Sequence, residues 1–63
     1  GEVNEVIQVQ ALLQKLGFDP GVADGSMGPK TRSAIEAFQR SANLPVTGNV
    51  DAGLIRALLG RSI

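Results

Sequence analysis

A loop ends and a helix begins within the stretch Asp24-Gly25-Ser26-Met27-Gly28-Pro29-Lys30-Thr31. Asp24-Gly25 is a turn signal, because an aspartate carboxylate can accept a bond from the backbone two residues on and glycine accepts a positive φ. Gly28-Pro29 predicts a helix N-cap followed by the first helical residue, where a proline loses no hydrogen bond. The residues of one helical face then follow at Thr31, Ala34, Ile35, Phe38 and Ala42. We therefore expect a helix over residues 29–42.

Two further helices are expected, one on each side of this one. An apolar stripe predicts the first over residues 4–16, with Asn4 as its N-cap and Gly17 in the left-handed position after its last turn. The third is expected over residues 52–59, with Asp51 as its N-cap and Gly60 at its end. In the middle helix, Asn43 would end the last turn, and Glu36 is expected to pair with Arg40.

The two predicted loops, residues 18–27 and 44–50, belong to a weak internal repeat. Gly48 lies 23 residues after Gly25, and both glycines sit in a similar run of turn, inward apolar residue (Met27 or Val50), cap and amphipathic helix. One such unit cannot bury its own apolar face, so both copies are expected to pack on the first helix and on each other. The prediction is an all-α fold, a compact three-helix bundle with two Asp/Thr-Gly turn loops and a weak internal repeat. We expect a single domain over residues 1–63, with its core at about 4–60.

Composition excludes several classes of function. The 63 residues include no histidine, cysteine, tryptophan or tyrosine, and six basic residues balance six acidic ones. Without Cys or His, neither a disulfide nor a structural zinc site is available, so packing and helix ends must stabilise this small chain. The neutral charge argues against nucleic acid as a partner, and no apolar run approaches the ~20 residues that span a bilayer. The usual nucleophile–base pairs are absent, and we expect no catalytic residue, no metal and no cofactor.

Four motifs follow one another along the chain: Leu16-Gly17-Phe18, Asp24-Gly25-x-Met27-Gly28-Pro29-x-Thr31, Ala34-Ile35-x-x-Phe38-Gln39 and Leu44-x-x-Thr47-Gly48. Together they resemble the type 1 peptidoglycan-binding domain, a three-helix module attached to many bacterial and phage wall hydrolases. The resemblance covers about residues 6–59. It differs in the second copy, which has Thr47 where the family more often has aspartate, Asp51 where glycine is common and Leu54 where threonine is common.

The resemblance implies a non-catalytic module that binds cell-wall peptidoglycan or a muropeptide and targets a linked enzyme or protein to it. It implies a monomeric domain that is tethered to a catalytic or other domain, with no nucleic acid and no membrane insertion. The expected location is periplasmic, cell-wall or extracellular as part of a longer precursor, although this sequence shows no signal peptide. The alternative is a protein–protein interaction or regulatory domain, of the pro-domain type, that uses the same fold.

Each candidate binding residue has a structural alternative. Asp24 either only forms the turn or also faces the amides and hydroxyls of a muropeptide, and Thr31 either ties the helix to the loop or faces the ligand. Gln10 and Gln39 either bond loop backbone or offer their amides to the polymer. Lys30 is either a solvated residue or a partner for a stem-peptide carboxylate. The predicted ligand-binding set is Gln10, Asp24, Gly25, Ser26, Thr31, Gln39 and Asn43.

Overall fold

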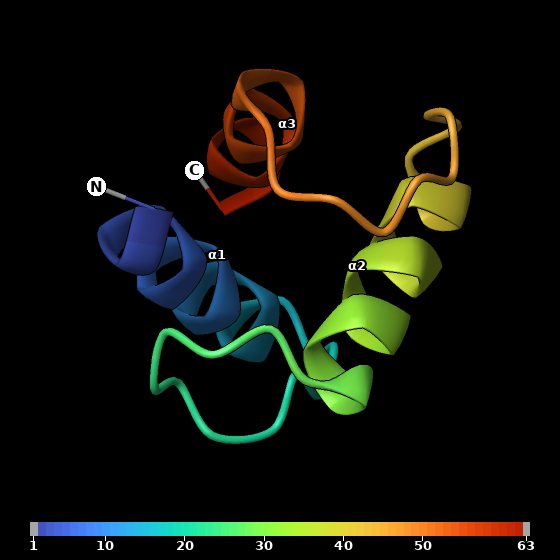
Figure 1. Ribbon diagram of the computed structural model, residues 1–63. Helices are drawn as coiled ribbons and strands as arrows, with labels where there is room; N and C mark the ends of the chain where they lie inside the picture. The colour runs from blue at the N-terminus through green and yellow to red at the C-terminus, as the bar shows by residue number, and fades with distance from the viewer. Residues whose placement is uncertain (1, 63) are drawn as a thin grey trace.

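The computed structural model describes residues 2–62, which form three helices and, over that range, no strand. They are α1 (Glu2–Lys15), α2 (Pro29–Ser41) and α3 (Ala52–Ser62), and Figure 1 shows them gathered around a common centre. Both α2 and α3 pack against α1. The predicted all-α three-helix architecture is confirmed. The predicted domain limits, Gly1 and Ile63, lie outside the described residues.

The core is built from the predicted stripe of each helix. An edge-to-face contact extends it, because the rings of Phe18 and Phe38 lie 5.7 Å apart at 88°. Leu16, Leu44 and Val50 are among the half-buried side chains that pack around it. The buried cluster consists of Val9, Leu13, Ala34, Ile35, Phe38, Leu54 and Leu58.

The chain reverses after α1 and α2 by the same device. Gly17 has φ 90°, and the N–H of Phe18 donates to the carbonyl of Leu13 at 2.9 Å. At the end of α2, Asn43 has φ 63° and the N–H of Leu44 donates to the carbonyl of Gln39 at 2.8 Å. Both ends are Schellman motifs, in which a left-handed residue satisfies carbonyls of the last turn. The predictions for Gly17 and Asn43 are confirmed.

Two predicted helix ends are wrong. The α1 helix already runs at Glu2, so Asn4 is a residue within it and not its N-cap. Residues 2 and 3 are neither glycine nor proline, so the local sequence contains no signal that would prevent the helix from starting before Asn4. The α3 helix continues through Gly60 to Ser62. Glycine inside a helix costs about 1 kcal/mol. In the turn that follows Gly60, Arg61 contacts α2: its guanidinium donates to the Ser41 carbonyl at 3.2 Å and lies 5.9 Å from the Phe38 ring centre.

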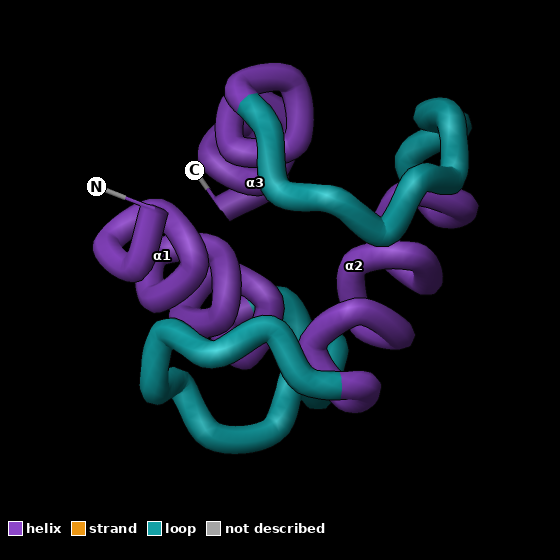
Figure 2. The backbone as a smooth tube through the Cα atoms, in the orientation of Figure 1, coloured by secondary structure: helices purple, strands orange, loops and turns teal. Residues whose placement is uncertain are grey.

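The two connections lie at opposite ends of α2 (Figure 2). The first, residues 16–28, runs beside α1 before it enters α2, and the second, residues 42–51, joins the far end of α2 to α3. Val50 is half-buried against the core, as predicted, but Met27 is 44% exposed and the prediction of an inward side chain there is wrong. The space beneath the first connection is taken instead by the buried side chains of Gln10 and Thr31.

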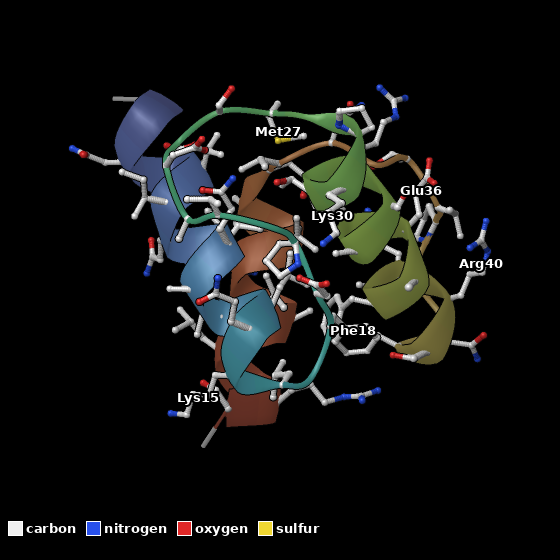
Figure 3. The ribbon with its side chains drawn as sticks, turned by 90° about the horizontal axis from the view of Figure 1, so that it is seen from below. Lys15, Phe18, Met27, Lys30, Glu36 and Arg40 are labelled. Atoms are coloured by element: carbon white, nitrogen blue, oxygen red, sulfur yellow. The ribbon has the colours of Figure 1, made fainter. Side chains whose placement is uncertain are left out.

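The outer face of α2 also differs from the prediction. Glu36 pairs with Arg32 at 3.7 Å, and Figure 3 shows Arg40 pointing away from the rest of the molecule. The second connection explains this choice, because a methyl group on Gly48 would lie 3.0 Å from the Arg32 side chain and 3.1 Å from the Glu36 carboxylate. The loop backbone thus lies against Arg32 and Glu36 and holds them together.

Candidate functional site

A buried amide connects the first connection to both α1 and α2. Gln10, with no exposed surface, accepts a bond from the N–H of Gly25 at 2.9 Å. Its Nε2 donates to the carbonyl of Ser26 and to the hydroxyl of Thr31, each at 3.0 Å. The Thr31 hydroxyl in turn donates to the carbonyl of Pro20 at 2.8 Å. Because these buried groups are hydrogen-bonded to one another, the connection has a defined shape before any ligand arrives.

The turn at Asp24 forms as predicted. Its Oδ1 accepts a bond from the N–H of Ser26 at 2.9 Å, and Gly25 has φ 80°. Asp24 and Ser26 are exposed, whereas Gln10 and Thr31 are buried beneath them. Asp24 and Ser26 therefore lie on the surface of this connection, and the buried side chains of Gln10 and Thr31 support it from beneath.

Gln39 supports the second connection in the same way. It is buried, and its Oε1 accepts bonds from the N–H groups of Thr47 and Gly48, both at 3.0 Å. Its Nε2 donates to the Thr47 hydroxyl at 3.1 Å. Asn43 is exposed nearby, at the end of α2. The structure thus divides the predicted set into two groups, with Gln39 and Asn43 at the end of α2 opposite to the others.

An open hollow of about 470 Å³ lies where the first connection enters α2. We call it the first hollow. It contains three residues of the predicted set, Asp24, Ser26 and Thr31. The apolar part of its lining was not predicted from the sequence. The one sequence signal for it was a valine in a polar loop, Val22, which is 75% exposed in the structure. The complete lining is Pro20, Gly21, Val22, Asp24, Ser26, Gly28, Pro29, Lys30 and Thr31.

Lys30 is held at the edge of the first hollow. Its Nζ lies 3.0 Å from Oδ2 of Asp19, whose Oδ1 accepts the N–H of Gly21 at 3.1 Å. The Lys30 stem runs along the backbone, since a methyl group on Gly21 would lie 3.5 Å from it. Figure 3 shows the side chain extending from α2 toward the first connection. The hydrogen bond from Lys30, then that from Gly21 and the positive charge of Lys30, lower the pKa of the Asp19 carboxyl.

The lowered pKa of Asp19 predicts a measurable pH effect. An aspartate with a depressed folded-state pKa stabilises the fold above its unfolded-state pKa, and this contribution is lost as the pH falls through the folded-state value. We expect an NMR titration of the parent to place the pKa of Asp19 below the usual aspartate range, and Lys30→Met to raise it. Arg40→Met, which removes a distant exposed cation from the same helix, should leave the Asp19 titration in place. An unchanged Asp19 titration in Lys30→Met would contradict the ion pair.

A second hollow, of about 240 Å³, lies beside the second connection. Beside it, the N-terminus of α3 is capped by a side chain, because Oδ1 of Asp51 accepts the N–H of Leu54 at 2.8 Å. This bond confirms Asp51 as the predicted N-cap. Apart from Gln39, each residue that lines the second hollow lies 23 positions after a residue that lines the first hollow. The internal repeat therefore extends from the turns to the two hollows. The second is lined by Gln39, Leu44, Pro45, Thr47, Asp51, Gly53 and Leu54.

The side chains that line these hollows can take part in hydrogen bonds, ion pairs and apolar contacts. The lining of the first includes one carboxylate (Asp24), two hydroxyls (Ser26 and Thr31) and one ammonium group (Lys30) among apolar walls. Over residues 2–62, no three His, Cys, Asp or Glu side chains are grouped so that they could hold a metal ion. In the same part of the chain, no helix has the length and apolar character needed to cross a membrane.

Comparisons with known proteins point to one family. The peptidoglycan binding domain family matches residues 2–58. The localization factor PodJL of Caulobacter vibrioides is 45% identical over 49 residues, which is 78% of this chain and 5% of that protein. The N-acetylmuramoyl-L-alanine amidase CwlM of Mycobacterium tuberculosis is 36% identical over 55 residues, which is 87% of this chain and 14% of that protein. The type VI secretion system spike protein VgrG3 of Vibrio cholerae is 55% identical over 40 residues, which is 60% of this chain and 4% of that protein.

This chain therefore corresponds to a small part of each of these relatives. No solved structure matches it. The family match, over residues 2–58, includes α1, α2, both turns and the first part of α3. The chain belongs to the peptidoglycan-binding domain family.

Proposed function

We propose that this domain attaches a longer protein to cell-wall peptidoglycan and so targets a linked enzyme or other domain to that polymer. The observation that carries the proposal is the family match together with a preformed, open hollow at the turn that contains the family's Asp-Gly and Gly-Pro motifs. The domain is non-catalytic in this proposal, and the work of any linked enzyme is done elsewhere in the longer protein.

We assign the predicted binding residues three different roles. Asp24, Gly25 and Ser26 would contact the muropeptide, since Asp24 and Ser26 are exposed in the lining of the first hollow. Gln10 and Thr31 would act as positioning residues, because their polar atoms already bond the loop that carries the contacts. The remaining two, Gln39 and Asn43, would shape the second connection and the end of α2.

The proposal places the domain in the periplasm, in the cell wall or outside the cell, where peptidoglycan is accessible. The similarity to part of an N-acetylmuramoyl-L-alanine amidase supports a module that works beside a wall enzyme. We propose that the domain is a monomer tethered to its partner domains. With no tryptophan or tyrosine in the chain, recognition would depend on polar and ionic contacts rather than on stacking against sugar rings.

The second candidate is a protein–protein interaction domain with the same fold. It is favoured by the similarity to part of a localization factor, a protein whose name does not describe a wall enzyme. In that case the first hollow would hold a segment of another protein, and the domain would not bind purified peptidoglycan.

Sedimentation with purified insoluble peptidoglycan tests the proposal. We expect the parent domain to sediment with the polymer, and Val22→Gln to weaken this binding about threefold, because Val22 would lose part of its apolar contact with the ligand. Val46→Gln is the matched control, since Val46 is also an exposed valine, 45% accessible, but lies on the second connection. Neither change should lower the melting temperature. A parent domain that stays in the supernatant while a known wall binder sediments would overturn the proposal and favour the interaction domain.

A further inference from the structure

The hydroxyl group of Thr47 lies in the wall of the second hollow and is held in a fixed direction. Its Oγ1 accepts one bond from Nε2 of Gln39 at 3.1 Å and another from the N–H of Asn49 at 3.2 Å. A hydroxyl oxygen has two lone pairs and one proton, so these bonds use both lone pairs and leave the proton. Within residues 2–62 this proton has no acceptor, and the Thr47 side chain is exposed. The second hollow therefore offers an oriented hydrogen-bond donor.

The loop backbone fixes which way the Gln39 amide faces. Oε1 of Gln39 accepts the N–H groups of Thr47 and Gly48, both at 3.0 Å, so the NH₂ group must be the one that faces the Thr47 hydroxyl. Gln39 is buried, and its side chain has little freedom to reverse these bonds. The Thr47 oxygen thus acts as the acceptor toward Gln39, and its proton remains for a ligand.

The equivalent position of the first copy cannot offer this donor. Asp24 lies 23 positions before Thr47, and its Oδ1 accepts the N–H of Ser26 in the same way that Thr47 accepts the N–H of Asn49. An ionised carboxylate only accepts hydrogen bonds. The two copies thus form the same turn, but the second one has a proton to donate where the first has a negative charge.

The rest of the second hollow limits the chemistry of its ligand. Leu44, Pro45 and Leu54 give it apolar walls, and no lysine or arginine of the described residues lines it. Its carboxylate, Asp51, uses Oδ1 to cap α3, and within residues 2–62 the other oxygen accepts no bond. The hollow of about 240 Å³ thus combines one donor, one acceptor and an apolar surface, and its negative charge disfavours an anion.

We propose that the second hollow binds an uncharged secondary amide that carries a methyl group. The amide carbonyl accepts the Thr47 proton, the amide N–H faces the Asp51 carboxylate, and the methyl group contacts Leu44 and Pro45. The inference rests on the proposed function and extends it to a second site on the domain. Peptidoglycan contains such amides in two places, the N-acetyl groups of its sugars and the alanine units of its stem peptide.

Two probes distinguish these sources, each titrated by NMR into the labelled domain. One is the peptide-free disaccharide of peptidoglycan, which has N-acetyl groups, and the other is an alanine-containing stem peptide with an amidated C-terminus and no sugar. We expect at least one of them to shift the backbone amides of Gly48 and Asn49 in a saturable manner. Binding of the disaccharide assigns the site to N-acetyl groups, and binding of the peptide assigns it to alanyl amides. No saturable shift with either probe would overturn the site.

Thr47→Asp is the variant that tests the hydroxyl proton. An aspartate can still accept the bonds from Gln39 and from the N–H of residue 49, as Asp24 does in the first copy, but it has no proton to donate. We expect it to bind the probe about three- to tenfold more weakly, the range for one hydrogen bond. Thr47→Ser keeps the hydroxyl and should bind like the parent. Val46→Asp, which places the same charge on the exposed neighbouring residue, should also bind like the parent. Parent-like binding by Thr47→Asp would contradict the inference.

Gly53→Gln tests the position of the site without touching Thr47. Gly53 lines the hollow, and a Cβ added to it would lie 3.5 Å from Oδ1 of Asp51, so a longer side chain begins inside the site. Gly60→Gln is the matched control, because Gly60 is in the same helix, does not line the hollow and has no atom of the described residues within 4 Å of an added Cβ. Neither variant should lower the melting temperature, since glutamine favours helix more than glycine does. We expect Gly53→Gln to lose probe binding and Gly60→Gln to keep it, and equal binding by both would overturn the site.

The outcomes separate this inference from the proposed function. A parent domain that sediments with insoluble peptidoglycan, but shows no saturable shift at Gly48 and Asn49 with either probe, overturns the amide site and leaves the proposed function standing. A domain that does not sediment, yet binds a probe in a manner that depends on Thr47, supports the amide site and overturns the proposed function.

Discussion

Phe38→Ala is expected to unfold most of the protein at room temperature. Phe38 has no exposed surface, and its ring contacts Phe18 from the first connection and lies beneath Arg61 from α3. Truncation of a buried aromatic side chain to alanine costs about 3–5 kcal/mol. Small domains have a total free energy of unfolding of about 5 kcal/mol or little more, so the loss is comparable to the whole. Thermal unfolding followed by circular dichroism measures it.

Ile7→Ala is the control for this experiment. Ile7 is also a large apolar residue in a helix, but it is 38% exposed and lies outside the buried cluster. Its loss should lower the midpoint only slightly. A cooperative transition of Phe38→Ala near the parent temperature would show that the second helix is not anchored by this ring.

Gln10→Glu is expected to destabilise the protein by about 3 kcal/mol or more at neutral pH, the range for an uncompensated buried charge. Gln10 uses its Nε2 to donate to the Ser26 carbonyl and the Thr31 hydroxyl, and an ionised carboxylate has no proton to donate. It would instead face the Ser26 carbonyl with like partial charge. Chemical unfolding of the variant and the parent at several pH values measures the difference in stability.

The pH dependence of this variant has a definite sign. Burial raises the pKa of the introduced carboxyl in the folded state above its unfolded value of about 4.3. The variant should therefore be closest to the parent in acid, where the carboxyl is protonated in both states, and should lose stability as the pH rises. Gln14→Glu is the control, because Gln14 is exposed on the same helix and makes one bond, to the Gly21 carbonyl at 2.9 Å. Equal stability of Gln10→Glu and the parent at neutral pH would contradict the role of Gln10.

Local signals predicted the helices and most of their ends because those signals act over a few residues. Gly17 and Asn43 take the left-handed conformation that ends a helix, and Gly28-Pro29 begins one. Glycine at position 60 was misread, since the same residue is compatible with a helix that continues. Beyond it, Arg61 donates to the carbonyl of Ser41 on α2, a contact distant in sequence that no local signal reveals.

The site was less accessible to sequence reasoning. The periodicity of α1 places Gln10 at the edge of a buried face, and the bonding of loop backbone by Gln10 and Gln39 was one of two open alternatives. The hydrogen-bond partners lie 15 or more residues away for Gln10 and eight or nine for Gln39. The spacing of residues alone therefore could not decide between bonds to the loop and contact with a ligand. The ion pair between Lys30 and Asp19 was not expected, because it requires the first connection to fold back on α2.

The sequence by itself determined three helices, their apolar faces, the turns at Gly25 and Gly48 and the repeat that relates them. These features follow from conformational preferences and from periodicity, both of which act within a helix turn or a loop. Only the tertiary structure decided which polar side chains became buried supports and which remained on the surface of the hollows. That choice depends on groups brought together from α1, the connections and α2. Gly28 and Asp51 illustrate both contributions. The sequence contains the difference between glycine and aspartate, and in the folded protein the N-terminus of α2 has no side-chain cap, whereas that of α3 is capped by the Asp51 carboxylate.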